Sequence, residues 1–449
     1  MKKEQLKVKC IGIDEEGKGI VNIKGRDIYV SNLLEGETAL VEISENKNII
    51  NPKVIKIEEY SKDRVKPPCP YFGRCGGCQI QHMSYEAQGR FKQTQVEDLM
   101  GHYCKVNGIL TMEEPYYYRN KIHSTFSYDK KGQIISGFYQ ENTHDVIDIN
   151  RCIIQDSKAD EIIETIKGFM RSFKMKPYNE DTGEGFLRHV LIKRGFATNQ
   201  VMVVLVVSSK IFPGKKNYIK ALTKKHPEIS TIIMNINNRK TSVVLGNEEV
   251  VLYGRGYIED ILCGVKFQIS AKSFYQVNPI QTKVLYNKAI EMAKLKGDET
   301  VIDAYCGIGT ISLIVSSKVK NVIGVELNND AVKDAIKNAK QNNIKNAYFY
   351  NDDAGDFMVN LANENKKIDL VIMDPPRAGS DEKFLSSVVK LSPEKVVYIS
   401  CNPVTQERDL RYLVKNGYKV SEIQPVDMFP QTVHVESIIM MTYCGSKSK

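Results

Sequence analysis

The chain has 449 residues, too many for one ordinary hydrophobic core, and its 42% hydrophobic and 26% charged residues are typical of a folded globular protein of two or three domains. No apolar run approaches the roughly 18 residues of a membrane-spanning helix, and the N-terminus, MKKEQLKVKC, lacks the apolar core of a signal peptide, so we expect a cytoplasmic protein without membrane contact. The net charge of +9 comes mostly from residues 61–270, where 30 basic side chains outnumber 22 acidic ones, and such an excess fits contact with phosphates.

Residues 1–60 show the pattern of short β-strands. Apolar residues alternate with polar ones at 20–30, 39–43 and 54–57, and turns containing Gly or Asn separate these runs. About five short strands in a segment of this length predict a small closed β-barrel of the OB type. Such barrels often hold nucleic acid, and the alternative is a barrel that only packs against the rest of the chain.

A cysteine cluster interrupts the strand pattern after residue 60. Cys69, Cys75 and Cys78 stand among prolines and glycines, and Cys152 follows 74 residues after Cys78. Because the chain has no export signal, we expect metal ligands, catalytic thiols or small buried residues, not a disulfide framework. Four thiolates can bind zinc or hold an iron–sulfur cluster, and the spacing alone does not decide between them. The flanking glycines permit the tight loops of the bulkier cluster.

The rest of the chain divides at about residue 270. Residues 61–269 mix a helical stretch at 85–100 with strand-like runs such as 201–207, as in an α+β domain. Beyond residue 270, apolar strands alternate with helices, which predicts a parallel, doubly wound sheet; its clearest strands are 301–305, 321–326, 369–374 and 395–400. The predicted fold is multidomain α/β, with an OB-like barrel (1–60), an α+β domain containing the cysteine cluster (61–269) and a Rossmann-like domain (270–449).

A glycine-rich turn follows the first strand of the predicted sheet. Gly307 and Gly309 let the backbone approach a ligand at a helix N-terminus. Ser312 stands where a dinucleotide fingerprint has its third glycine, so that fingerprint fails. Glu326 ends the next strand, 23 residues after Asp303, where an acid can accept hydrogen bonds from ribose hydroxyls.

A third strand ends in Asp374, Pro375 and Pro376, whose prolines stiffen the loop and fix the direction of the carboxylate. In an open α/β sheet, the glycine turn, the ribose-binding acid and this loop converge on one crevice at the carboxyl ends of the strands. Together they predict a site for S-adenosylmethionine.

Cys401 follows the strand 395–400 at the same edge of the sheet. Carbon 5 of uracil is a poor nucleophile, but a thiolate that adds to carbon 6 creates an enolate that can attack the methyl group of the cofactor. The site must therefore lower the thiol pKa or supply a base. Glu436, just before the last apolar strand, can remove the carbon 5 proton afterwards. Taken singly, the two residues would be a buried thiol and a surface acid; their shared edge favours catalysis.

Over essentially its whole length, the sequence resembles the RNA uracil-C5 methyltransferase family. The resemblance rests on five motifs: Phe274-Tyr-Gln-Val-Asn-Pro279, Asp303-x-Tyr-Cys-Gly-x-Gly309, Asp374-Pro-Pro-Arg377, Ser400-Cys-Asn-Pro403 and His434-Val-Glu436. It implies that Cys401 is the nucleophile and Glu436 the proton acceptor. It further implies four contacts to S-adenosylmethionine, from Gln276, Tyr305, Glu326 and Asp374.

The resemblance also bears on the N-terminal half. It implies that the barrel is a TRAM domain, the RNA-binding appendage of many members, and that Cys69, Cys75, Cys78 and Cys152 hold a [4Fe–4S] cluster. Methyl transfer by this route needs no redox chemistry, so the cluster is expected to be structural or to shape the RNA contact surface. These features favour 23S ribosomal RNA as substrate, with transfer RNA as the alternative.

A uridine in folded RNA must be flipped out of its stack to reach a thiolate. The run Tyr116–Lys121, rich in aromatic and basic residues, resembles a family segment near the RNA and is a candidate contact. Arg188 and His189 are weaker candidates, and Lys193 with Arg194 can serve phosphates.

Three other functions compete with this interpretation. An iron–sulfur oxidoreductase would combine the cysteine cluster with a nucleotide-binding sheet, but the missing third glycine and the Asp374 loop argue against it. A non-catalytic RNA-binding module would not need both Cys401 and Glu436. Methylation of an adenine amino group has no use for Cys401. We expect a monomer with no obligatory protein partner.

Overall fold

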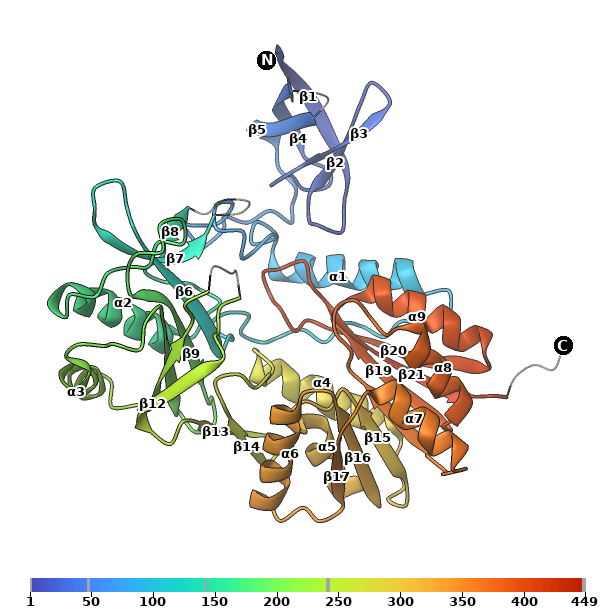
Figure 1. Ribbon diagram of the computed structural model, residues 1–449. Helices are drawn as coiled ribbons and strands as arrows, with labels where there is room; N and C mark the ends of the chain where they lie inside the picture. Colours follow the sequence, from blue (N-terminus) through green and yellow to red (C-terminus); the bar gives the residue numbers. More distant parts are fainter. Residues whose placement is uncertain (1, 47–48, 141–142, 144, 240–242, 446–449) are drawn as a thin grey trace.

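The structure is a computed structural model that describes residues 2–46, 49–140, 143, 145–239 and 243–445. These residues form a five-stranded sheet, two seven-stranded sheets and a β-hairpin. In Figure 1 the N-terminal sheet stands above the other two, which lie side by side. None of the helices in the described ranges is long and apolar enough to cross a membrane.

The N-terminal sheet is antiparallel, with strand order β3-β2-β1-β4-β5. Its strands are β1 (Lys2–Ile13), β2 (Gly19–Ile23), β3 (Arg26–Val30), β4 (Thr38–Asn46) and β5 (Ile49–Glu59). The edge strands β3 and β5 contact each other, so the sheet curls around its own core. Alternating residues such as Val8, Val21 and Val41 fill that core, which explains the alternation in the sequence. The assignment of this sheet as a TRAM domain stays a prediction.

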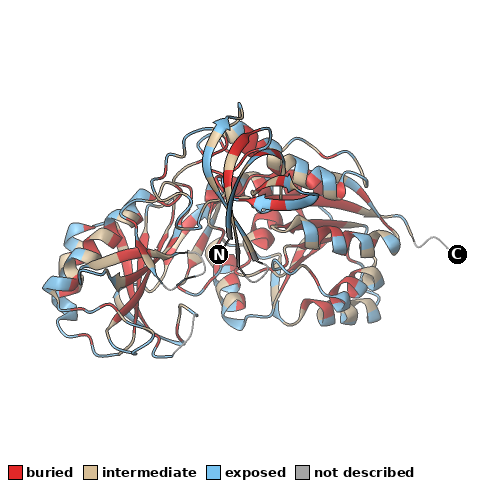
Figure 2. Ribbon diagram, turned by 90° about the horizontal axis from the view of Figure 1, so that it is seen from above, coloured by how far each residue is buried: buried red, intermediate tan, exposed pale blue. Residues whose placement is uncertain are grey.

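The middle sheet has the order β12-β11-β10-β9-β6-β7-β8 and is antiparallel except between β10 and β11. Its strands are β6 (Lys121–Tyr128), β7 (Ile134–Tyr139), β8 (Val146–Asp148), β9 (Leu187–Arg194), β10 (Val201–Val207), β11 (Ile229–Ile236) and β12 (Glu248–Gly254). Every residue of β10 is buried because both of its faces are covered. Figure 2 shows buried strands, in red, inside the protein. Val203 and Leu205 pack with α2 (Ser157–Ser172) and α3 (Lys215–Lys225), whereas Met202 and Val204 pack toward the C-terminal half.

The C-terminal sheet has the order β17-β16-β15-β18-β19-β21-β20. Its strands are β15 (Thr300–Ala304), β16 (Asn321–Glu326), β17 (Ala347–Asn351), β18 (Leu370–Met373), β19 (Lys395–Ser400), β20 (Tyr418–Val426) and β21 (Glu436–Tyr443). The first five strands in this order are parallel, as predicted, but β21 runs antiparallel to both β19 and β20. The reason is that no helix joins β20 to β21, so the chain turns back on itself and β21 inserts beside β19.

Helices cover both faces of this sheet. They are α4 (Pro279–Ala293), α5 (Thr310–Val315), the short 3-10 helix η1 (Ser316–Lys318), α6 (Asn329–Gln341), α7 (Ala354–Asn363), α8 (Glu382–Leu391) and α9 (Pro403–Lys415). The hairpin of β13 (Ile258–Leu262) and β14 (Val265–Ile269) leads into α4. Helix α1 (Tyr85–Met100) precedes the middle sheet in the sequence, yet it packs against α9 and β20 (Figure 1). The polypeptide therefore crosses from the C-terminal sheet to the middle one and back.

Candidate active site

Four neighbouring parallel strands end at the residues predicted for the site. Glu326 is the last residue of β16, and Tyr305, Asp374 and Cys401 directly follow β15, β18 and β19. The registers Ala304↔Val325, Ala304↔Met373 and Met373↔Tyr398 keep these strand ends level. The four side chains are therefore brought to one edge of the sheet, although 75 positions separate Glu326 from Cys401 in the sequence.

Glu436 reaches the same edge from the opposite direction. It is the first residue of β21, and Ser437 pairs with Ser400 at the end of β19. Cys401 and Glu436 are the residues next to this pair on the two strands, and the Glu436 carboxyl group acts electrostatically on the Cys401 thiol. The register places the predicted nucleophile and the predicted proton acceptor side by side.

The glycine-rich turn after β15 has a left-handed backbone at Tyr305, Gly307 and Gly309, with φ of 66°, 56° and 79°. Glycine is required at position 309 for two reasons. Its φ is positive, and a Cβ there would come within 2.9 Å of the Phe349 ring. Acids on both sides hold the turn: a Glu326 carboxylate oxygen accepts the Gly307 N–H at 3.1 Å. On the other side, Asp303 accepts the Ser312 N–H at 2.8 Å.

Three carboxyl groups at this edge have raised pKa values. Burial raises the pKa of Asp303 to about 7, although its hydrogen bonds with Ser312 oppose the shift. Burial and the neighbouring Asp303 raise the pKa of Asp374. Burial and Asp374 raise the pKa of Glu436, while Arg377 lowers it. Among the described residues, one Glu436 carboxyl oxygen has no hydrogen-bond partner. Such clustered, perturbed acids are typical of proton-transfer sites.

The Cys401 thiol is half-buried, and its pKa is raised to about 12 by burial, Glu436 and Asp374, against the opposing effect of Arg377. The sequence left two routes to a thiolate, a lowered pKa or a nearby base. The structure does not lower the pKa, so the nucleophile depends on a base. The carboxyl groups beside it are the groups available for that task.

This electrostatic environment predicts slow alkylation of Cys401 in the free protein. A thiol of pKa about 12 is ionised to only one part in about 10,000 at pH 8, and ionisation rises about tenfold per pH unit. We expect iodoacetamide to label the exposed Cys444 well before Cys401, with Cys401 labelling increasing steadily up to pH 10. Mass spectrometry of the two peptides measures both rates. Equal labelling of the two thiols at pH 8 would show that the Cys401 pKa is not raised.

Gln276 approaches the site from the loop before α4. Asn278 caps this helix by accepting the Gln281 N–H, and Pro279 begins it. The same Asn-Pro arrangement starts α9 directly after Cys401. Gln276 and Cys401 therefore each stand just before a helix with a capped N-terminus, which holds their positions. Gln276 and Thr310 both interact with the hydroxyl of buried Tyr286.

Two features of the site have no signal in the sequence. Tyr286 lies inside α4, where a lone tyrosine in an apolar stretch reads as core. Arg377, recognised only as part of a motif, contacts the His434 ring at 3.0 Å, and these residues are 57 positions apart. Burial and Arg377 lower the pKa of His434 to about 4. Only tertiary structure reveals that Tyr286 lies near Asp374 and that Arg377 lies near Cys401 and Glu436.

A cleft of about 1220 Å³ opens beside Cys401. Its walls come from the N-terminal sheet, the cysteine-containing loop, α1 and the segment before β21. The aromatic residues Tyr29, Phe72 and Phe91 lie along it, and Arg377 and His434 stand near Cys401. The predicted nucleophile therefore faces a space large enough for more than one nucleotide.

The predicted cysteine ligands lie near one another, but the structure does not confirm them as a metal site. Cys69, Cys75 and Cys152 each act electrostatically on Cys78, and burial with these neighbours raises the pKa of Cys78 to about 12. Within the described ranges, no group of three or more His, Cys, Asp or Glu side chains is placed to hold a metal ion. The geometry thus does not confirm the predicted ligand set.

Several residues that were predicted to contact RNA instead make their contacts inside the protein. Tyr118 is fully buried and donates to the Pro430 carbonyl at 2.9 Å. Arg188 is buried and pairs with Glu180 at 3.1 Å. Lys193 is buried, donates to the carbonyls of residues 270 and 273, and has its pKa lowered to about 7 by burial. His189 is buried too, and Arg194 pairs with Asp156. For Tyr118, Arg188, His189 and Lys193 the prediction of a surface contact was wrong, because burial depends on the assembled sheet.

Comparisons with known proteins agree with this geometry. Residues 84–443 match the family model described as tRNA (Uracil-5-)-methyltransferase. An uncharacterized RNA methyltransferase of Clostridium tetani is 45% identical over 443 residues, covering 98% of this chain and 96% of the relative. Another, from Bacillus cereus, is 41% identical over 447 residues, with coverage of 98% and 97%.

A solved structure extends the likeness to three dimensions. It is the Pyrococcus abyssi tRNA (uracil-54, C5)-methyltransferase in complex with S-adenosyl-L-homocysteine, with a TM-score of 0.81 and 28% identity, covering 97% of this chain and 100% of that one. S-adenosyl-L-homocysteine is what S-adenosylmethionine becomes after losing its methyl group. The chain therefore belongs to the tRNA (uracil-5-)-methyltransferase family of S-adenosylmethionine-dependent RNA methyltransferases.

Proposed function

We propose that the protein methylates carbon 5 of a uridine in RNA through a covalent bond between Cys401 and carbon 6 of the base. The observation that carries this proposal is the register of β19 and β21, which sets Cys401 beside Glu436 at the strand ends. A methyltransferase acting on an amino group has no need of a thiol and a carboxyl group placed in this way. S-adenosylmethionine supplies the methyl group, and Gln276, Tyr305, Glu326 and Asp374 are proposed to hold it.

The proposed reaction needs three proton transfers, and two carboxyl groups with raised pKa values stand beside the thiol. Asp374 takes the proton of Cys401 as the sulfur bonds to carbon 6, and the ring electrons pass to carbon 5. Carbon 5 then bonds to the methyl carbon, and the electrons of the broken sulfur–methyl bond stay on the leaving sulfur. Glu436 removes the carbon 5 proton, the ring double bond returns, and the Cys401 sulfur leaves and regains its proton from Asp374.

We propose 23S ribosomal RNA as the substrate, because the curled N-terminal sheet and the cysteine pattern resemble family members of that type. Transfer RNA is the second candidate, favoured by the Pyrococcus abyssi neighbour, whose name gives uracil 54 of tRNA as its target. In either case the RNA enters along the cleft beside Cys401, where exposed Tyr29 offers a ring for stacking.

Unmodified transcripts of 23S ribosomal RNA and of transfer RNA, offered separately with methyl-labelled cofactor, test the substrate. Label in the ribosomal transcript alone supports our proposal, and label in the transfer RNA alone replaces it with the second candidate. Label in neither transcript, from protein that binds S-adenosyl-L-homocysteine, would contradict both.

We further propose that Cys69, Cys75, Cys78 and Cys152 hold a [4Fe–4S] cluster. Their mutual proximity supports this, as does the nature of the donor set, four thiols without nitrogen or oxygen ligands. A cluster there would tie the loop around Cys78 to the segment before α2. Its role is structural, because no step of the reaction moves an electron.

Protein purified without oxygen is expected to contain four irons and four sulfides per chain. The Cys152→Ser variant should lose most of that iron, whereas Cys444→Ser, at an exposed cysteine, should keep it. Metal and sulfide analysis with the visible absorption spectrum provides the measurement. One zinc per chain without sulfide would replace the cluster by the zinc alternative.

A further inference from the structure

The loop that joins β20 to β21, residues 427–435, is held largely by other parts of the chain. Its first five carbonyl groups, those of residues 427–431, each accept a hydrogen bond from a different group outside the loop. Taken from the carbonyl of residue 427 to that of residue 431, the donors are the side chains of Gln281, Asn278, Lys92 and Tyr118 and the backbone N–H of Ile80. The donor–acceptor distances are 2.9–3.3 Å. An irregular segment with five successive carbonyls fixed in this way has little freedom to move.

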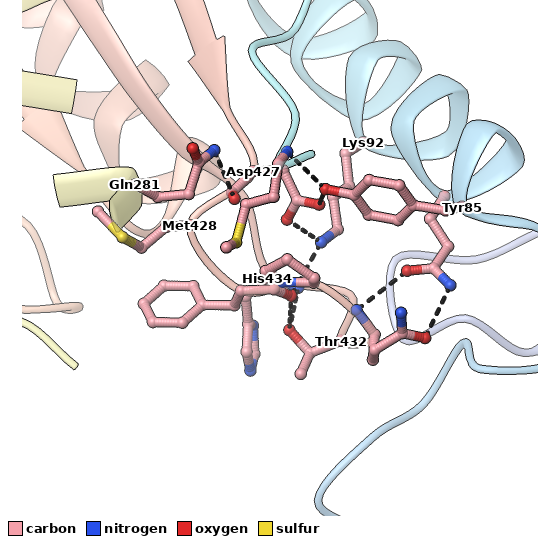
Figure 3. Close-up of polar contacts among 12 residues, drawn as sticks. Tyr85, Lys92, Gln281, Asp427, Met428, Thr432 and His434 are labelled. Atoms are coloured by element: carbon pink, nitrogen blue, oxygen red, sulfur yellow. Dashed lines mark hydrogen bonds and ion pairs between the residues drawn. The ribbon is translucent and has the colours of Figure 1, made fainter. Parts of the chain in front are cut away.

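Helix α1 is also joined to the loop by an ion pair in the interior, between Lys92 and Asp427 (Figure 3). Lys92 and Asp427 are completely buried, and the Lys92 ammonium lies 2.6 Å from the Asp427 carboxylate. The other Asp427 oxygen accepts the Tyr85 hydroxyl at 2.9 Å. Lys92 also donates to the Phe429 carbonyl at 3.0 Å. Since a buried charge without its partner is very unfavourable, this pair locks the start of the loop to α1.

A second set of contacts from α1, made by Gln88, stabilises an unusual backbone conformation at Gln431. Gln431 has φ of 73°, in the left-handed region that residues other than glycine rarely adopt. The Gln88 side chain makes two hydrogen bonds to it: its amide donates to the Gln431 side-chain oxygen at 3.0 Å and its oxygen accepts the Gln431 N–H at 3.0 Å. Strained conformations of this kind persist where neighbours fix them, and they are common at active sites.

The end of the loop forms the wall of the cleft. Val433, His434 and Val435 line it together with Cys401, and His434 contacts Arg377. The next residue is Glu436, whose strand partner is Val426, the residue just before the loop. Both ends of the loop therefore flank the predicted proton acceptor, and any shift of the loop moves the start of β21.

We propose that α1 positions Glu436 for removal of the carbon 5 proton, with Gln88 and Lys92 as positioning residues that act through the 427–435 loop. The inference rests on the proposed covalent mechanism. Loosening the loop should slow the last step, proton removal and release of Cys401, more than the earlier steps. We therefore expect a covalent complex of enzyme and methylated RNA to accumulate during turnover.

The test uses Gln88→Leu, which keeps the side-chain size and removes both bonds to Gln431. Gln93→Leu is the matched control, because Gln93 lies on the same helix but bonds to the backbone of residues 107 and 109 instead. A second variant, Gln431→Gly, loses the side-chain bond to Gln88 and keeps the backbone N–H bond, in a residue that favours positive φ. The full-length proteins are incubated with RNA and cofactor, and the complex that survives denaturing electrophoresis is compared with released 5-methyluridine.

We expect Gln88→Leu and Gln431→Gly to raise the ratio of trapped complex to product about tenfold and Gln93→Leu to leave it unchanged. Equal falls in complex and product in all three variants would indicate general destabilisation and overturn the inference. Glu436→Gln serves as the reference. Trapping by Glu436→Gln but not by Gln88→Leu overturns the inference alone, whereas no trapping in any protein overturns the covalent mechanism and this inference with it.

Discussion

Replacing Cys401 with alanine is expected to abolish methyl transfer to RNA while leaving binding of S-adenosylmethionine intact. The thiol stands at the end of β19 facing the cleft, and no other cysteine of the described chain follows a strand at this edge except Cys306. Cys306 is buried in the glycine turn and does not line the cleft, so it does not substitute. By analogy with the removal of other enzymatic nucleophiles, turnover should fall by about 10⁴-fold or more.

Steady-state methyl transfer and equilibrium binding of S-adenosyl-L-homocysteine measure the two halves of this expectation. Cys104→Ala is the matched control, a half-buried cysteine packed beneath α1 that should retain wild-type turnover. Substantial turnover by Cys401→Ala would refute the covalent route. Loss of cofactor binding in Cys401→Ala would instead place the thiol in the cofactor site.

Replacing Glu436 with glutamine is expected to stop the reaction after methyl transfer. An amide of the same shape does not accept the carbon 5 proton, so the ring double bond does not return and Cys401 stays attached to the base. Turnover should fall roughly 10²–10⁴-fold, the usual contribution of a general base. At the same time, most of the protein should run on denaturing gels as a complex with methylated RNA.

Glu291→Gln, on the exposed surface of α4, is the control and should show neither effect. The labelled methyl group should appear in the trapped complex of Glu436→Gln, because methyl transfer precedes proton removal. A trapped complex without the methyl group would move Glu436 to an earlier step. Normal turnover by Glu436→Gln would remove it from the mechanism.

The local features of this fold could be predicted from the sequence because local physics determines them. Glycines at 307 and 309, an acid at 326 and a stiff loop after Asp374 each lie at the carboxyl end of a strand, and parallel strands end at a common edge. That Cys401 and Glu436 are adjacent could not be predicted. It depends on the insertion of β21 between β19 and β20, which follows from long-range pairing and not from periodicity.

The electrostatics of the site were equally inaccessible from the sequence. The raised pKa of Cys401 arises from burial and from carboxyl groups on β21 and after β18, which meet only in the folded chain. The same holds for Tyr118 and Lys193, whose aromatic and basic character predicted RNA contact but whose polar groups bind backbone carbonyls inside the protein. Residue type indicates the chemistry that a side chain can perform, and tertiary packing decides whether it faces solvent.

Identification of the methylated nucleoside tests the central claim most directly. The wild-type protein is incubated with unmodified cellular RNA and methyl-labelled S-adenosylmethionine, and the RNA is digested to nucleosides and separated. The proposed mechanism predicts label in 5-methyluridine alone. Label in a methylated adenosine, or in a uridine methylated on its ribose, would contradict attack by carbon 5 and the role given to Cys401.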